Sequence, residues 1–203
     1  MRRPARPGVL RTVREDLAAA RRGDPAARGD LENAVVYSGL HAIWTYRLTH
    51  RLWHAQQLPG ARFAARVIAQ VARSVTGIEI HPGARIGRRF FIDHGMGVVI
   101  GETAVIGDDV LLFHGVTLGG RGSGRTDTVP SGVHAHGVRR HPRVGDRVVL
   151  GAGSSLIGAI TVGADSVVGA NTVVTKDVPP GSVVTGIAGS ARPRSGHEGV
   201  PTL

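Results

Sequence analysis

Aliphatic residues recur at every sixth position through the second half of the chain, and this period restricts the possible folds more than any other feature. An α-helix has a period of about 3.6 residues and a β-strand one of about 2, so neither produces it. Small residues, often glycine, come directly after these positions. The positions in register are Ile80, Ile86 and Ile92; Ile100, Ile106, Leu112 and Leu118; and Val144, Leu150, Leu156, Val162, Val168 and Val174.

A coil of three short strands explains the period. One aliphatic residue on each side points inward, and the following small residue permits the corner, so a turn takes about 18 residues. A β-sandwich explains it less well, because its turns come every ~8–12 residues without a fixed glycine. A narrow core of Ile, Val and Leu also accounts for the few aromatic residues, 4 Phe, 2 Trp and 2 Tyr. The sequence therefore predicts a parallel β-helix.

Residues 1–75 show helical spacing instead. We expect a first helix near residues 10–22 and a long one over residues 33–53, where the apolar stripe includes Leu40 and Ile43. Asp24 followed by Pro25 is a typical helix start, which makes Asp24 a candidate N-cap. Phe63 and the apolar residues after it predict a last helix to about residue 74.

The expected organisation has three parts and the α+β class. Residues 1–75 form an N-terminal helical domain, and residues 76–185 form the β-helix domain with an inserted loop at 119–143. Residues 186–203 form a flexible tail.

Composition excludes several classes of protein. The chain has no cysteine, which rules out disulfide frameworks, thiolate catalysis and cysteine-ligated metals. Its Arg-rich start lacks the apolar stretch of a signal peptide, and its longest uncharged run, residues 148–164, is glycine-rich. We expect a cytoplasmic protein that does not enter a membrane.

The net charge of +10 is concentrated at one end. Residues 1–75 hold 13 arginines against 5 acidic residues, whereas residues 76–203 are nearly balanced. Such a basic half is compatible with nucleic acid, a membrane surface or an anionic substrate. No nucleic-acid-binding motif accompanies it, so no nucleic acid partner is expected.

Several segments are more specific than the repeat. They are Asp24-Pro-Ala, Gly39-Leu-His-Ala-Ile-Trp-Thr-Tyr-Arg-Leu, Gly77-Ile-Glu-Ile-His-Pro-Gly-Ala-Arg-Ile-Gly, Phe91-Ile-Asp-His-Gly-Met-Gly, Gly115-Val-Thr-Leu-Gly-Gly and Arg140-His-Pro. From about Asp24 to Val184 the chain resembles serine O-acetyltransferases, whose fold is a left-handed parallel β-helix. The resemblance implies acetyl transfer from acetyl-CoA to the hydroxyl of L-serine, the entry step of cysteine biosynthesis.

His94 is the candidate general base. Asp93 and His94 lie where the six-residue register slips, and from the residues alone His94 is either catalytic or a surface histidine. The resemblance makes it the base and gives it Glu79 as its orienting acid. Because 15 residues separate them in coils of about 18, Glu79 is expected beside His94 on the adjoining turn. Many family members have Asp at this position.

The remaining site residues are also implied by the resemblance. Asp24 and Asp93 would bind the serine ammonium, and the Arg140 guanidinium would bind the carboxylate in a bidentate way. His141 would donate to the oxyanion or contact serine.

Acetyl-CoA is expected in a groove between subunits. The residues implied to contact it are Gly120, Ala152 and Ala170, which the repeat also requires as small corner residues. In the inserted loop, Arg121, Arg125, Arg139 and Arg140 either meet the CoA phosphates or lie in a solvated loop.

Alternative functions stay open at this point. A hexapeptide acetyltransferase for sugar or antibiotic hydroxyls is one, and a non-catalytic hexapeptide assembly protein is another. A three-histidine metal site of the γ-carbonic-anhydrase kind would need His81 and His114 near His94. We expect no metal.

Assembly is expected through the β-helix as a homotrimer or a dimer of trimers. In the resembled family a C-terminal Ile inserts into O-acetylserine sulfhydrylase, whereas this chain ends in Leu203, which keeps an apolar end but changes the branching. The resemblance also implies inhibition by L-cysteine at the serine site.

Overall fold

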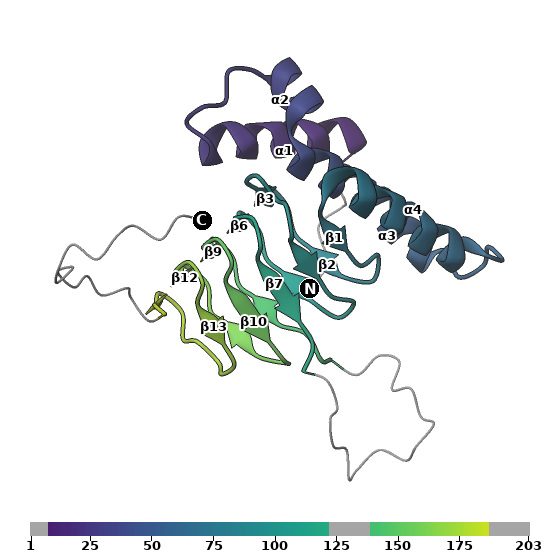
Figure 1. Cartoon of the computed structure of the whole chain (residues 1–203). Helices are drawn as coiled ribbons and strands as arrows, with labels where there is room; N and C mark the ends of the chain where they lie inside the picture. The colour runs from purple at the N-terminus through teal and green to yellow at the C-terminus, as the bar shows by residue number, and fades with distance from the viewer. Residues whose placement is uncertain (1–7, 122–138, 187–203) are drawn as a thin grey trace, which may run out of the picture.

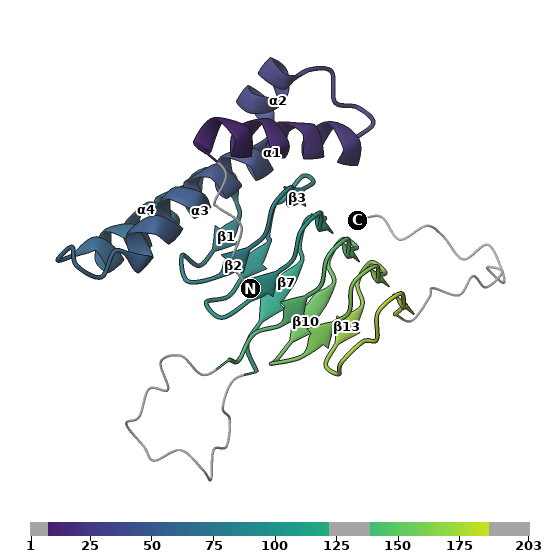
Figure 2. The same ribbon diagram turned by 180° about the vertical axis from the view of Figure 1, so that it is seen from behind.

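The computed structural model describes residues 8–121 and 139–186, in which four helices precede a stack of short strands (Figure 1). The helices lie together at one end of the stack, as both ribbon views show (Figures 1 and 2). They are α1 (Val9–Gly23), α2 (Asp30–Val36), α3 (Ser38–His54) and α4 (Ala61–Thr76).

Two expectations about the helices were wrong. The helix after Asp24 does not begin there but at Asp30, with Gly29 at its N-cap position. The long helix expected over residues 33–53 is divided at Tyr37, whose extended backbone, with φ −85° and ψ 102°, ends α2 and precedes α3. Apolar spacing continues across this break, so it gave no signal in the pattern.

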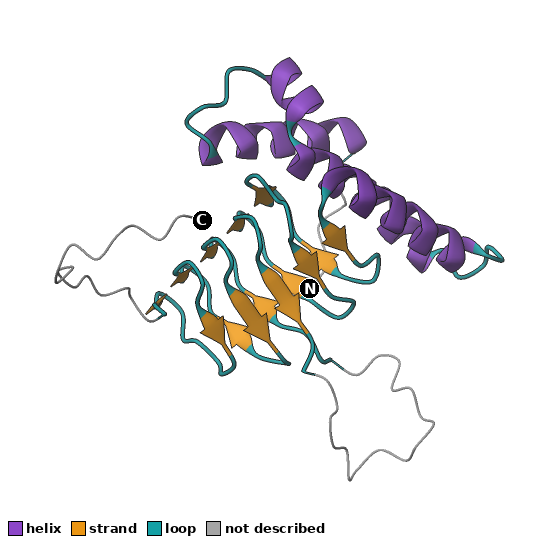
Figure 3. Ribbon diagram, viewed as in Figure 1, coloured by secondary structure: helices purple, strands orange, loops and turns teal. Residues whose placement is uncertain are grey.

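The strands form three parallel sheets that make the three sides of a prism (Figure 3). Sheet A has the order β1 (Glu79–Ile80), β4 (Val99–Ile100), β7 (Thr117–Gly119), β10 (Ser155–Ile157), β13 (Val173–Val174). Sheet B has the order β2 (Arg85–Ile86), β5 (Val105–Ile106), β8 (Arg143–Val144), β11 (Thr161–Val162). Sheet C has the order β3 (Phe91–Ile92), β6 (Leu111–Leu112), β9 (Val149–Leu150), β12 (Val167–Val168), β14 (Val183–Val184).

The six-residue register appears in the pairing. Ile80 pairs with Ile100, and Ile100 pairs with Leu118, so aliphatic residues of successive coils stack in the prism. Most of the repeat positions are buried, and they form one continuous core. An N-terminal helical part followed by a left-handed β-helix is thus confirmed as the fold class.

The helices are fixed to the first coils by packing and by ion pairs. Leu17, Ala20 and Leu40 pack on Phe91 of β3. The buried carboxylate of Asp16 on α1 accepts two hydrogen bonds from Arg47 of α3, at 2.7 and 3.1 Å, which join the two helices. Glu15 of α1 accepts from Arg88 Nε, directly after β2, at 2.9 Å, which joins α1 to the first coil. This attachment holds the helical part in a defined place above the coils.

Helix α4 exposes part of its apolar face. Three apolar residues of α4 are largely exposed: Phe63 (76%), Val67 (46%) and Val71 (58%). The apolar residues that predicted this helix therefore do not all enter the core.

In the described part of the chain no helix is both long and apolar enough to cross a membrane. The expected tail and the middle of the inserted loop lie outside the described residues.

Candidate functional site

The first group of site residues lies at the corner between sheets C and A, directly after β3. Here the Asp93 N–H donates to Leu112 O at 2.8 Å on the next coil. The side chain of His94 is 73% exposed, and its Nε2 lies 3.8 Å from Asp93 Oδ2. His94 has φ 60°, but Arg89 and Asp109 at other corners are similar, so this conformation belongs to the corners and does not mark function.

A pocket of about 310 Å³ opens beside this corner. Its lining comes from three separate segments: Asp24, the junction of α2 and α3, and the end of β3 with the two residues after it. Gly39 permits this arrangement, because a Cβ at this position would lie 2.2 Å from Ile92 O. The lining residues are Asp24, Val36, Tyr37, Ser38, Gly39, Ile92, Asp93 and His94.

Asp24 is held in the pocket by two hydrogen bonds. Its Oδ2 accepts from the Tyr37 hydroxyl at 2.5 Å, and its Oδ1 accepts from the Ala26 N–H at 2.7 Å. The hydrogen bond from Tyr37, and to a smaller extent the one from Ala26, lowers the pKa of Asp24. The same hydrogen bond to Asp24 raises the pKa of Tyr37 to about 12. The pocket therefore presents a fixed carboxylate, and the N-cap role expected for Asp24 is wrong because its side chain closes a local turn instead.

Glu79 begins β1 and pairs with Val99 of β4, on the coil next to the one that holds the His94 corner. The Gly97 N–H donates to Gly77 O at 2.9 Å, so the two segments stack directly. The Glu79 carboxylate, however, forms an ion pair with Arg73 of α4, Nε to Oε2 at 3.0 Å. Within the described residues it makes no hydrogen bond or ion pair with His94, so a Glu79–His94 dyad stays a prediction.

The second group lies at the corner between sheets A and B. The Thr103 hydroxyl accepts from the N–H groups of Arg140 and His141, at 3.0 and 3.2 Å. Arg140 Nη2 donates to Glu102 Oε2 at 3.1 Å, and the Arg140 side chain is 61% exposed. Thr103 thus ties the start of β8 to the preceding coil.

His141 has a defined tautomer. Its Nδ1 accepts from the backbone N–H of Thr103 at 3.1 Å, so the proton of the neutral ring is on Nε2. Burial lowers the pKa of His141, and the nearby Arg140 adds to this. The ring also requires Gly101, where a Cβ would lie 2.1 Å from it. His141 is consequently a neutral Nε2–H donor, which suits an oxyanion contact better than proton abstraction.

The expected cofactor residues divide between the two corners. Gly120 lies beside the His141 ring at the A/B corner, where a Cβ would be 3.3 Å from Nε2. Ala152 and Ala170 lie at the C/A corner, below His94 and His114. Backbone hydrogen bonds join this column: Gly153 N–H to His114 O at 2.9 Å, and Asn171 N–H to Ala152 O at 2.8 Å.

The histidines needed for a metal site do not come together. His94 and His114 have ring centroids 5.9 Å apart, but His81 contacts Trp53 at 5.0 Å near the other corner. Burial lowers the pKa of His81 to about 4. No group of three metal-binding side chains occurs among the described residues.

The loop arginines differ in their surroundings. Arg139 Nη2 donates to Ile160 O at 2.8 Å and to Thr161 at 3.3 Å, so its guanidinium already has protein partners. Arg121 is exposed at the edge of the described residues, and Arg125 lies outside them.

Sequence reasoning missed three residues of the two groups: Tyr37, Glu102 and Thr103. Glu102 and Thr103 follow the aliphatic position Ile100 at a corner, where polar residues are ordinary. Tyr37 lies between α2 and α3, and because the apolar spacing continues across this break, no signal in the sequence marked it.

Comparisons with known proteins find close relatives of this chain. Residues 141–176 match the bacterial transferase hexapeptide family (six repeats). The serine acetyltransferase of Mycobacterium tuberculosis is 51% identical over 181 residues, which are 89% of this chain and 72% of that protein.

Solved structures show the same fold. Serine acetyltransferase isoform 3 of Entamoeba histolytica, in complex with cysteine, is 37% identical with a TM-score of 0.80, over 92% of this chain and 61% of that one. The enzyme of Brucella abortus, in complex with coenzyme A, is 37% identical with a TM-score of 0.76, over 88% and 65%. The chain thus spans less than two thirds of either crystallised chain.

Proposed function

The chain belongs to the serine acetyltransferase family, and from this premise we propose that it transfers the acetyl group of acetyl-CoA to the hydroxyl of L-serine. The products are O-acetyl-L-serine and CoA. The observation that carries the proposal is the pocket in which two carboxylates, Asp24 and Asp93, lie with His94. An amino acid brings one ammonium group and one hydroxyl to such a pocket.

The residues divide the reaction among them. Asp24 and Asp93 bind the ammonium of serine, and His94 removes the hydroxyl proton as the oxygen attacks the thioester carbonyl. His141 donates its Nε2–H to the oxyanion, and Arg140 binds the serine carboxylate. Collapse of the tetrahedral intermediate breaks the carbon–sulfur bond, and the CoA thiolate takes the proton from His94. Glu79, in this proposal, turns from Arg73 to orient the histidine.

A trimer completes this site. Within one subunit, His94 lies at the corner where the strands of sheet A begin, and His141 lies at the corner where they end. The width of one side of the prism separates them. We infer a trimer in which sheet A of each subunit faces the three-fold axis. The C/A corner of one subunit then lies beside the A/B corner of the next.

Acetyl-CoA fits the column of small residues below His94. The corner residues His114, Ala152 and Ala170 follow one another on successive coils. Backbone at small residues allows a pantetheine chain to approach the wall closely. We propose that the cofactor runs down this corner, with Gly120 of the neighbouring subunit on its other side. In this proposal no residue of the site binds a metal ion.

Two further proposals concern ligands and partners. L-cysteine has the ammonium and carboxylate of serine, so we propose that it inhibits by occupying the same pocket. We also propose that the tail ending in Leu203, outside the described residues, contacts O-acetylserine sulfhydrylase.

The activity is tested by CoA release with serine, homoserine and simple sugars as acceptors. Serine should give the highest kcat/KM. Release with a sugar but not with serine would refute the acceptor assignment.

The shared site is tested by mixing two inactive variants, His94→Ala and His141→Asn. Subunit exchange should restore activity toward about a quarter of the wild-type value, because a random mixture contains some interfaces with both histidines intact. If each subunit held a whole site, mixing would restore nothing.

A further inference from the structure

A second pocket, of about 430 Å³, lies on the other side of the prism from the proposed subunit interface. It is enclosed by α1, α3 and the corner that joins sheet B to sheet C after β2. This corner is opposite sheet A, so the pocket stays open to solvent in the proposed trimer. The lining residues are Thr12, Tyr46, Arg47, His50, Arg51, His54, Arg85, Ile86, Gly87 and Arg88.

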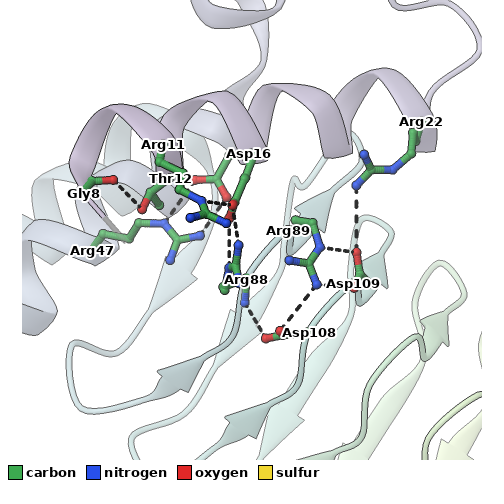
Figure 4. A network of polar contacts seen from close by, with 11 residues as sticks. Gly8, Arg11, Thr12, Asp16, Arg22, Arg47, Arg88, Arg89, Asp108 and Asp109 are labelled. Atoms are coloured by element: carbon green, nitrogen blue, oxygen red, sulfur yellow. Dashed lines mark hydrogen bonds and ion pairs between the residues drawn. The ribbon is translucent and has the colours of Figure 1, made fainter. Parts of the chain in front are cut away.

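The pocket is strongly basic. Four arginines line it, and none of its lining residues is acidic. Two of the four are neutralised from α1: Arg47 by Asp16, and Arg88 by Glu15 through Arg88 Nε at 2.9 Å. Figure 4 shows Arg47 and Arg88 beneath α1, within a network of ion pairs. Their guanidinium groups are therefore held in place.

The other two arginines carry excess charge. Arg51 and Arg85 are exposed, and neither side chain makes a hydrogen bond or an ion pair with another described residue. They come from α3 and β2, the two elements on either side of the pocket. Two guanidinium groups without counter-ions, next to two fixed ones, leave a local excess of two positive charges.

The base of the pocket is rigid. The buried Tyr46 hydroxyl donates to Ala84 O at 2.7 Å and accepts from the Ile86 N–H at 3.2 Å. His50 Nδ1 donates to Pro82 O at 2.8 Å. These bonds fix α3 against the corner after β1 and against β2, so little ordering is needed when a ligand binds.

We propose that this pocket binds a small oxyanion ligand with at least two negative charges, either inorganic phosphate or sulfate or a phosphorylated small molecule. Arginine suits this class, because its planar fork matches two oxygens of a phosphate or sulfate group. A recessed pocket favours a small ligand over an extended polymer. The pocket is also larger than the one proposed for serine, which leaves room for more than one oxyanion group.

The test is calorimetric titration of the full-length protein without CoA, because CoA carries phosphate groups of its own; variants of the pocket arginines separate binding here from binding in the cofactor groove. The probes are inorganic phosphate, sulfate, pyrophosphate and ATP, with chloride as the monovalent control. We expect binding of at least one of these four, and tighter binding of pyrophosphate or ATP would identify a phosphorylated ligand. If phosphate or sulfate binds as well as these two, the ligand is an inorganic dianion.

Substitutions at Arg51 and Arg85 test whether the oxyanion binds in this pocket. The double variant Arg51→Gln, Arg85→Gln should weaken binding by about tenfold or more for each arginine removed. Arg143→Gln is the matched control, because Arg143 is exposed on the same sheet but does not line the pocket. Both exposed changes should leave the thermal unfolding midpoint and the acetyl transfer rate unchanged.

Three results would overturn the proposal: no binding of any probe to the wild type, equal binding by the double variant, or equal weakening in Arg143→Gln. None of these results bears on serine acetylation, whose failure would be seen separately in the CoA-release assay.

Discussion

The hydroxyl of Thr103 organises the Arg140–His141 segment, and replacing Thr103 with valine should weaken the site while keeping the shape of the side chain. The substitution removes three interactions: the acceptor for two backbone N–H groups, at 3.0 and 3.2 Å, and the contact with His141 Nδ1 at 2.8 Å. Each hydrogen bond of this kind contributes about 0.5–1.5 kcal/mol net, so the three together contribute about 1.5–4.5 kcal/mol.

Solvent reduces this figure, because water can replace part of what the exposed Arg140 segment loses. We therefore expect about 1–3 kcal/mol, which corresponds to about a 5- to 150-fold change in an equilibrium or rate. This loss of free energy should appear partly as a lower unfolding temperature and partly as a lower kcat/KM for serine.

The assay is steady-state CoA release with serine varied, together with thermal unfolding. Thr103→Ser keeps the hydroxyl and should stay near wild type in both measurements. Wild-type kcat/KM in Thr103→Val, or equal loss in Thr103→Ser, would refute the positioning role.

Four further predictions concern the site and its surroundings. His94→Ala should fold and assemble while kcat falls by about 10²–10⁴, and Glu79→Gln should cost less; near-normal turnover of His94→Ala would place the base elsewhere. Arg140→Lys should raise KM for serine by about tenfold and change KM for acetyl-CoA little, and the reverse pattern would assign Arg140 to the cofactor. Activity should survive exhaustive chelation, whereas a stoichiometric zinc with chelator-sensitive turnover would contradict the absence of a metal role. Burial lowers the pKa of His81 to about 4 against ~6.5 in an unfolded chain, so stability should decline as pH falls from ~6.5 toward ~4. His81→Asn should flatten this decline in thermal unfolding, and an unchanged slope would argue against it.

The six-residue repeat made the β-helix predictable, because the residues that recur with this period are also the residues buried in the core. Ile100 and Leu118 are inward-facing in the sequence pattern and are almost fully buried in the prism. The same period also assigned Asp93 and His94 to a place where the register slips, and they do lie at a corner.

Side-chain partners were less predictable than positions. Spacing placed Glu79 on the coil next to His94, but α4 brings Arg73 to its carboxylate at 3.0 Å. A helix packed on the first coil supplies this competing charge, and no periodicity within the β-helix encodes it. Tyr37 likewise gained its role from the break between two helices, which the apolar stripe did not record.

The inserted loop has a small effect on the fold's free energy. Arg85 pairs with Val105, 20 residues later, whereas Val105 pairs with Arg143, 38 residues later, because the loop intervenes. Closing a segment about twice as long costs only about 0.6 kcal/mol more in chain entropy. Insertions or deletions here therefore hardly alter the balance between the folded and unfolded chain. A change in the length of this loop can therefore alter the corner where Gly120 and His141 lie at little cost to the free energy of folding.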